Sequence, residues 1–247
     1  MLDEKCPVLG VDFVVSNLRE AVSCIKENIV SLKGQYICFG NVHTTVMAHE
    51  NSEYRAVQNG AVFVMPDGVP IHWEQRKKGH KKAAQVAGPD FMREIFLSSM
   101  DGSLSMYFYG STPETIAGLG KNLKKNYPGL DIRGLESPPF RHLSEEEDRE
   151  AVDRINASGA DILFVGLGAP KQEIWMASHK GRINALMLGV GAGFDFHAGT
   201  VKRAPKWMQK AGLEWLHRLF QDPGKLFKRY LVTNTKFLFY HIFDRAH

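Results

Sequence analysis

The sequence predicts an α/β fold, in which a Rossmann-like, largely parallel sheet is flanked by helices and followed by a helical, basic C-terminal appendage. Three observations predict this architecture. Short apolar runs alternate with helical patterns through residues 1–200. Two of these runs, Asp161–Gly166 and Ala185–Val190, are apolar throughout, as is typical of strands buried on both faces of a sheet. Residues 201–247 show no strand pattern.

The expected strands follow one another at residues 8–15, 35–40, 61–65, 104–109, 130–134, 161–166 and 184–190. Buried helix is the alternative for these runs, but their shortness and their flanking glycines favour strands. Helix starts between them carry capping signals. Asn17 with Glu20 has the spacing of a capping pair, and Ser144 precedes three glutamates. Thr112 stands before Pro113, which suits the first helical position.

Two domains are expected, an α/β catalytic domain at 1–200 and an appendage at 201–247 whose helices are punctuated by Pro205, Gly212 and Pro223-Gly224. A chain of 247 residues with 44% hydrophobic content can bury a sizeable core, which excludes whole-chain disorder. No run of about 18 apolar residues predicts a membrane-spanning helix. The acidic N-terminal segment is not expected to be a secretory signal. Three cysteines are too few for a disulfide framework, which fits a reducing cytoplasm.

The net charge of +4 is divided unevenly along the chain. Residues 201–247 hold ten lysines or arginines and three acids, a net charge of +7. Residues 1–200 hold 21 basic and 24 acidic residues, a net charge of −3. A basic, aromatic-rich tail on a mildly acidic body predicts an anionic partner. The modest overall charge and the lack of a recognition motif argue against nucleic acid as that partner.

The end of the tail has an amphipathic pattern. At 100° per residue, its basic side chains fall within an arc of about 100°, at Lys225, Lys228, Arg229 and Lys236. Apolar side chains lie opposite, at Phe227, Leu231 and Leu238. Three interpretations stay open: a helix packed on the body with a solvated basic face, a helix that touches anionic lipid, or basic residues that close over a diphosphate.

The loops after the strands are where ligands bind in open parallel sheets. The segment Gly166–Glu173, GLGAPKQE, is close to a dinucleotide fingerprint, but Lys171 replaces its third glycine. A nicotinamide-dependent oxidoreductase is therefore disfavoured. The turn at Gly168 and the helix start at Lys171 either bind a phosphate-bearing ligand or form an ordinary turn with a solvated lysine.

Two aspartates are candidates for chemistry. Asp67 follows an apolar strand within Pro66-Asp67-Gly68, where it is either part of a tight turn or a partly desolvated general base. Asp195 ends the glycine-dense loop Gly189–Asp195, where the backbone can approach a ligand and the carboxylate can accept hydrogen bonds from ribose. The sequence contains no Asp-x-Asp pair, so we expect no metal-diphosphate site.

Together these loops resemble the WecG/TagA/CpsF glycosyltransferases over nearly the whole chain. The resemblance is carried in order by Asn41-Val42-His43, Pro66-Asp67-Gly68, Val86–Asp90, Phe108–Pro113, Val165–Glu173, Gly189–Asp195, Arg203-Ala204-Pro205 and Gly212–Leu216. It implies an inverting transferase that moves N-acetylmannosamine, glucose or a related hexose from a UDP-sugar to a polyprenyl-diphosphate-linked saccharide in cell-surface polysaccharide synthesis. It also implies a cytoplasmic enzyme, peripheral on the inner face of the bacterial plasma membrane, with no cofactor and an anionic membrane surface as a partner. Homo-oligomerisation is left open.

The resemblance also implies residue roles. Asp67 matches the family's catalytic base, Gln172 its contact to the donor sugar and diphosphate, and Asp195 its contact to the nucleotide. Further donor-binding positions are expected in the same loops, at Asn41, Gln85, Gly110, Gly168 and Lys171. The family's basic appendage residues, which close over the diphosphate and help to reach the membrane, match Arg218, Lys225 and Lys228, with Arg229 nearby.

Two positions depart from the family pattern. Gln85 stands where many members have arginine, and Phe39 stands where many have threonine. These departures keep a second hypothesis open, a catalytically inactive nucleotide-sugar-binding protein with a regulatory or scaffold role. For an active transferase, inversion needs one base and positive charge on the departing UDP. Because no Asp-x-Asp pair is present, the cationic tail is the expected source of that charge, and we predict activity without a divalent metal.

Overall fold

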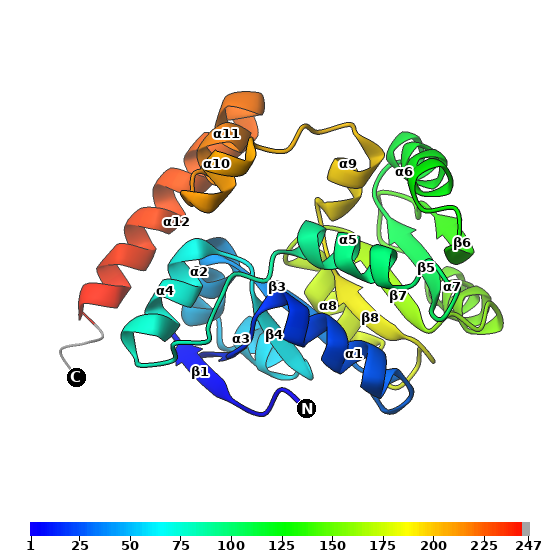
Figure 1. The fold of residues 1–247 in the computed structure, drawn as a ribbon, viewed down its shortest axis with the longest axis horizontal. Helices are drawn as coiled ribbons and strands as arrows, with labels where there is room; N and C mark the ends of the chain where they lie inside the picture. The colour runs from blue at the N-terminus through cyan, green and yellow to red at the C-terminus, as the bar shows by residue number, and fades with distance from the viewer. Residues whose placement is uncertain (244–247) are drawn as a thin grey trace.

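The computed structural model describes residues 1–243, apart from the side chains of Lys210, Lys225 and Phe243 (Figure 1). Its centre is an eight-stranded sheet in the order β1-β2-β4-β3-β8-β7-β5-β6. Every strand pair is parallel except β1 with β2. The strands are β1 (Lys5–Val8), β2 (Val11–Val14), β3 (Tyr36–Gly40), β4 (Phe63–Pro66), β5 (Ser105–Gly110), β6 (Asp131–Glu136), β7 (Ile162–Gly166) and β8 (Leu186–Gly189). The expected α/β architecture is confirmed.

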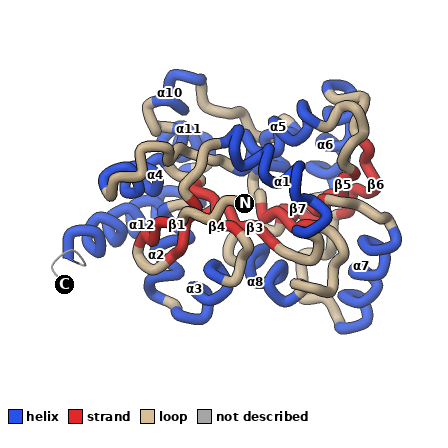
Figure 2. The backbone as a smooth tube through the Cα atoms, turned by 60° about the horizontal axis from the view of Figure 1, so that its bottom comes forward, coloured by secondary structure: helices blue, strands red, loops and turns tan. Residues whose placement is uncertain are grey.

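Helices cover both faces of the sheet (Figure 2). One face packs against α1 (Leu18–Leu32), α5 (Gly88–Ser98), α6 (Pro113–Asn126) and α9 (Gly193–Ala198). The other packs against α2 (Val42–Glu50), α3 (Ser52–Asn59), α7 (Glu145–Ala157) and α8 (Lys171–Ser178). Helix α4 (Val69–Lys77) contacts β1 and β4. On β7, Ile162 and Phe164 enter one core while Leu163 and Val165 enter the other. This two-sided burial explains the continuous apolar runs.

The three predicted N-caps are confirmed in atomic detail, but for Asn17 the structure shows the cap bond without the return bond from Glu20. The Asn17 side chain accepts a hydrogen bond from the Glu20 amide at 3.1 Å. The Thr112 hydroxyl accepts from the Thr115 amide at 3.2 Å, with Pro113 at the first helical position. Ser144 forms a complete capping box.

The expected single strand at 8–15 is wrong. The chain instead forms an antiparallel hairpin of β1 and β2, with register pairs from Lys5↔Val14 to Val8↔Val11. The turn consists of Leu9 and Gly10, which both have positive φ, 47° and 83°. Two consecutive residues with positive φ match the twist of a tight hairpin. Leucine rarely adopts this conformation, so Leu9 gave no turn signal.

The appendage is helical, as predicted, with α10 (Lys206–Lys210), α11 (Glu214–Gln221) and α12 (Pro223–Phe243). Helix α12 lies beside α2 (Figure 1). The Lys236 ammonium and the Tyr240 hydroxyl both reach the Glu50 carboxylate at 2.6 Å, and Phe237 is buried in the interface. Within residues 1–243, no helix combines the length and the apolar character needed to cross a membrane.

Candidate active site

Asp67 lies at the carboxyl end of β4, in the loop that leads into α4. Its amide donates to the Gly40 carbonyl at 2.8 Å, which ties this loop to the end of β3. The Gln85 side chain reaches the Asp67 carbonyl oxygen at 3.5 Å, so it supports the loop from the other side. No described residue donates a hydrogen bond to the Asp67 carboxylate, which is therefore available to a substrate.

The surroundings of Asp67 favour its protonated form. Burial raises the pKa of the Asp67 carboxyl well above its usual value, and the negative charge of Glu214 adds to this shift. Arg203 and Arg218 oppose it. A carboxyl with a raised pKa can accept a proton near neutral pH, as a general base must. Two of these charges, Glu214 and Arg218, come from α11, so the appendage reaches the catalytic candidate.

Arg203 joins the appendage to the body. Its guanidinium forms a two-pronged ion pair with Asp90 at the start of α5, with one contact of 2.8 Å, and its Nε donates to Glu214 at 3.0 Å. Arg203 and Arg218 both lie over the ring of Phe196 on α9, at 5.8 and 5.5 Å from its centroid. Arg203 is thus neutralised by two acids, whereas no described carboxylate pairs with Arg218. In the sequence, Arg203 and Asp90 stand out only as members of two separate motifs, because no local pattern links residues so far apart.

Gln172 is buried and holds two neighbouring strand ends together. Its Nε2 donates to the Gly189 carbonyl at 2.9 Å and to Glu173 at 2.7 Å, and its Oε1 accepts from the Gly168 amide at 3.2 Å. A Cβ at position 189 would lie 2.5 Å from the end of the Met176 side chain, which would have to move to make room for it. Both amide protons of Gln172 are therefore used inside the protein, which leaves its oxygen as the group that can still face a ligand.

Glu173 is hydrogen-bonded to Gln172 and helps to fix its position. Its carboxylate is buried and accepts from the Tyr54 hydroxyl at 3.2 Å, and Tyr54 in turn accepts from Gln58 at 2.8 Å. Burial raises the pKa of Glu173. Sequence reasoning gave this residue no role. The available signal was an acid on the same helical face as the apolar Met176.

We expect Gln172→Ala to lower the free energy of unfolding by about 2–4 kcal/mol, because it leaves the Gly189 carbonyl and the Gly168 amide without partners. Chemical denaturation measures this change. The matched control is Lys171→Ala on the preceding, exposed residue, which should stay within about 0.5 kcal/mol of wild type. A stable Gln172→Ala protein that has lost only donor affinity would show that this side chain serves the ligand and not the scaffold.

The other predicted donor positions lie in further loops at the ends of the strands. Asn41 caps α2, and its Oδ1 accepts from the His43 and Thr44 amides at 3.0 and 3.3 Å, so its Nδ2 remains available. Asp195 on α9 accepts from Thr115 of α6 at 3.4 Å. Gly110 has a φ of 134°, and a Cβ there would lie 2.6 Å from the Gly166 backbone. Lys171 is exposed at the start of α8. All four lie at the carboxyl edge of the sheet.

The basic residues of α12 are divided. Arg229 is partly buried against α2, where its charge acts on His43, and Lys228 is exposed. The side chain of Lys225 lies outside the described residues. Arg218 of α11 is therefore the predicted appendage cation whose charge acts on Asp67.

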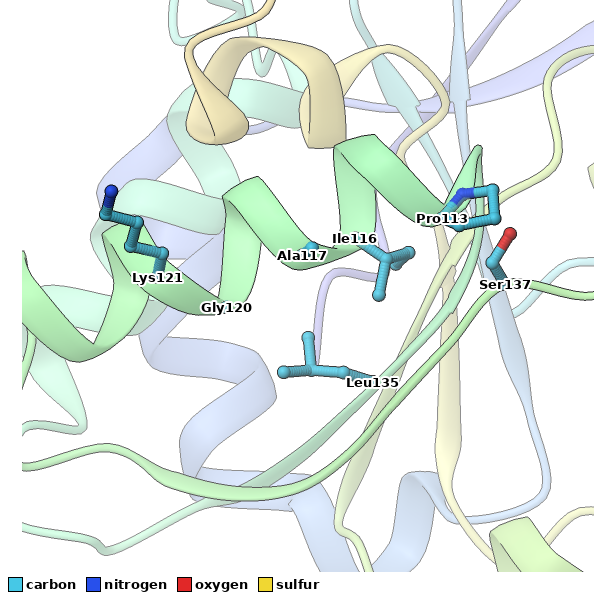
Figure 3. Close-up of a pocket in the computed structure, with 7 residues that line it drawn as sticks. All are labelled: Pro113, Ile116, Ala117, Gly120, Lys121, Leu135 and Ser137. Atoms are coloured by element: carbon cyan, nitrogen blue, oxygen red, sulfur yellow. The ribbon is translucent and has the colours of Figure 1, made fainter.

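A surface depression of about 520 Å³ lies between α6 and β6 (Figure 3). Ile116 and Leu135 face each other across it, and Lys121 and Ser137 stand near its two ends.

Among residues 1–243, no three histidines, cysteines or acids gather as metal ligands. The expectation of a metal-free reaction stays a prediction.

Comparison with known proteins gives two findings. The sequence model of the Glycosyl transferase WecG/TagA/CpsF family matches residues 6–247. The chain is also similar to the N-acetylglucosaminyldiphosphoundecaprenol N-acetyl-beta-D-mannosaminyltransferase of Bacillus spizizenii, with 30% identity over 221 residues, 89% of this chain and 84% of the relative.

Proposed function

Because the chain belongs to the WecG/TagA/CpsF family of glycosyl transferases, we propose that it moves a hexose from a UDP-sugar, with inversion, to a polyprenyl-diphosphate-linked saccharide. The name of the Bacillus relative specifies an undecaprenyl-diphosphate-linked N-acetylglucosamine acceptor and transfer of N-acetylmannosamine. For this chain we propose the same acceptor class, and N-acetylmannosamine, glucose or a related hexose as the sugar transferred. The reaction serves cell-surface polysaccharide synthesis.

The observation that carries this proposal is the Asp67 carboxylate, which accepts no hydrogen bond from a described residue and lies beside a cation from the appendage. Asp67 would take the proton of the acceptor hydroxyl while that oxygen attacks the anomeric carbon, and UDP would leave from the opposite face. Arg218 has no carboxylate partner among the described residues and lies close enough to Asp67 to act on its charge. It is therefore our candidate for stabilising the negative charge on the departing diphosphate.

The donor would lie along the carboxyl edge of the sheet, with the nucleotide toward Asp195 and Gly110 and the hexose toward Asp67. Asn41 would donate through its free Nδ2, and Gln172 would accept through Oε1. Lys225 and Lys228 remain candidates for the lid over the diphosphate. We further propose that the enzyme works as a peripheral protein on the inner face of the plasma membrane, where its lipid-linked acceptor is found.

The test is product formation from a panel of UDP-hexoses and a soluble polyprenyl-diphosphate-linked N-acetylglucosamine. We expect one donor to release UDP and to give a product with inverted anomeric configuration. Donor binding without UDP release would instead favour the inactive nucleotide-sugar-binding protein. Two observations bear on that alternative. Phe39 packs in the core, with its ring centroid 5.3 Å from that of Phe91, and Gln85 supports the Asp67 loop. Neither supplies the charge or hydroxyl found in many relatives.

We predict that transfer proceeds without a divalent metal. Excess chelator should leave the initial rate within about twofold, because the charge on UDP is met by guanidinium groups and not by a metal ion. The rate is measured as UDP release before and after dialysis against the chelator. Loss of activity that manganese or magnesium restores would contradict this assignment.

A further inference from the structure

Tyr109, the last residue but one of β5, is buried but has no hydrogen-bond partner for its hydroxyl. The residue is only 1% exposed. The indole of Trp175 stacks on its ring, with the centroids 5.1 Å apart and 21° between the planes, which holds the ring in place. No described residue forms a hydrogen bond with the hydroxyl. A buried hydroxyl without a hydrogen bond is costly, so a molecule from outside the chain has to supply the partner.

The side chain of Tyr109 lines a cavity of about 210 Å³ between the end of β6 and α7. Apolar side chains form part of its wall, at Pro138, Pro139, Leu143 and Ala151. Pockets for drug-sized ligands measure roughly 300–1,000 Å³. The cavity is smaller than that range, so it suits a ligand of one small ring.

The charged side chains that line the cavity are largely neutralised by neighbours. Glu136 accepts hydrogen bonds from the Arg154 guanidinium and from the Tyr107 hydroxyl, both at 2.8 Å. Glu147 accepts from two nitrogens of Arg141, at 2.6 and 2.7 Å. With these charges already paired, the cavity does not need a strongly charged ligand to balance it.

The groups left over are a mixture of donors and acceptors. Glu150 lies 3.8 Å from Arg154, beyond hydrogen-bond distance, and its carboxylate accepts from no described residue. The Arg154 guanidinium donates only to Glu136 among the described residues, so several of its N–H groups remain. Burial and the charge of Glu136 raise the pKa of Tyr109 to about 12, so its hydroxyl keeps its proton and can both donate and accept. Sugar hydroxyls, which also donate and accept, match such a mixture.

The cavity lies at the edge of the sheet farthest from β1 (Figure 1). Strand β6 is five positions from β4, which leads to Asp67, or roughly 24 Å at about 4.8 Å per strand. Tyr109 and Ala151 pack in the core on one face of the sheet, whereas Phe194, the neighbour of Asp195, packs in the core on the other face. Neither aspartate of the candidate active site therefore lines this cavity.

We propose that the cavity at Tyr109, Glu150 and Arg154 is a second binding site, which takes one neutral sugar ring through its hydroxyl groups. The Tyr109 hydroxyl and the Arg154 guanidinium donate to sugar oxygens, and the Glu150 carboxylate accepts from a sugar hydroxyl. The carbon face of the ring packs on the apolar wall. The inference does not depend on the proposed reaction, because it uses none of the residues assigned to the base or the donor.

The experiment is an NMR titration that follows the backbone amides of residues 137–143. The probes are glucose and N-acetylglucosamine, with cyclohexanol as a ring of one hydroxyl and butylammonium as a cation. We expect a sugar to bind the wild type with a dissociation constant on the order of 1 mM. Tyr109→Phe and Glu150→Ala should each weaken binding about tenfold. The matched control is Glu146→Ala, an exposed glutamate of α7 outside the cavity wall, which should change affinity less than about twofold.

Thermal unfolding without ligand separates binding from a structural role. The Tyr109 hydroxyl makes no hydrogen bond to a described residue, so Tyr109→Phe should melt at the wild-type temperature or above it. A lower melting temperature with unchanged sugar affinity would show a structural hydroxyl and overturn the proposal. A wild type that binds neither sugar, as when water alone fills the cavity, would also overturn it. So would butylammonium or cyclohexanol binding more tightly than both sugars. Because no readout depends on turnover, a failed transfer assay would not be mistaken for failure of this site.

Discussion

Asp67→Asn is expected to fold normally and to lose transfer activity by about 10²–10⁴-fold. The amide keeps the size of the side chain but cannot accept a proton from the acceptor hydroxyl. No described residue donates a hydrogen bond to this carboxylate, so the substitution breaks no hydrogen bond of the described scaffold. UDP release with saturating donor and acceptor measures the loss. A variant with near-normal turnover would remove Asp67 from the role of base.

The raised pKa of Asp67 predicts how the same substitution changes the stability of the fold. Between the ordinary value of about 3.9 and the raised value, the unfolded chain has lost the Asp67 proton while the folded chain still binds it. This carboxyl therefore makes stability fall as pH rises through that window. Asparagine has no charge to bury, so Asp67→Asn should melt at the same temperature as wild type or higher near neutral pH.

The pH profile gives an independent check of the assignment. Because only the ionised carboxylate is a base, kcat/KM of the wild type should fall as pH drops through the raised pKa, not near 3.9. Glu214→Gln removes the negative charge that adds to this shift, so it should move the acid limb to lower pH. An acid limb that stays in place would mean that Glu214 does not act on the base.

The parallel sheet could be predicted because its strands are buried on both faces, which leaves apolar runs visible in the sequence. The predicted runs at 35–40 and 161–166 differ from β3 and β7 by one residue at their starts. The hairpin of β1 and β2 was missed because its turn uses Leu9 in a conformation that leucine rarely adopts. Local patterns report burial well and report unusual backbone conformations poorly.

The candidate site was predictable only as a set of loops. Sheet topology places Asn41 and Asp67 at one edge because β3 and β4 are adjacent and parallel. The contacts between these loops could not be predicted from the sequence. The ion pair of Arg203 with Asp90 spans a long stretch of chain, and the buried Glu173 beneath Gln172 is recognisable only once α3 is packed against α8. Such contacts depend on tertiary packing, which no local pattern records.

The orientation of α12 settles which side of the tail faces the solvent. Lys236 of the basic arc pairs with Glu50, and Arg229 is partly buried, so much of this arc faces the body. The apolar side is left exposed: Phe227, Leu231 and Leu238 are 58, 59 and 61% exposed, and Ile242 is 64% exposed. At 100° per residue these four side chains fall within about 60° of one another. An exposed apolar stripe of this kind suits the boundary between lipid headgroups and acyl chains.

We therefore expect the triple variant Phe227→Gln, Leu231→Gln and Leu238→Gln to lose binding to phosphatidylglycerol-containing vesicles by on the order of 100-fold. Full burial of each side chain contributes roughly 1.5–3 kcal/mol, so even half-burial of three gives about 3 kcal/mol. Glutamine keeps the helix propensity, and vesicle co-sedimentation measures the loss. The control removes exposed apolar side chains elsewhere, with Val30→Gln on α1 and Ile174→Gln on α8, which are 81 and 50% exposed. That control should bind as the wild type does.

Salt distinguishes the apolar mechanism from the electrostatic one. Each basic residue near an anionic surface contributes about 1 kcal/mol, and salt screens this term. Since Lys236 is already paired with Glu50 and Arg229 faces α2, few cations of α12 remain to meet lipid. High salt should therefore weaken vesicle binding less than the triple substitution does. If salt abolished binding while the triple variant bound normally, the apolar stripe would have no part in docking, and the membrane contact would belong to the exposed lysines such as Lys228.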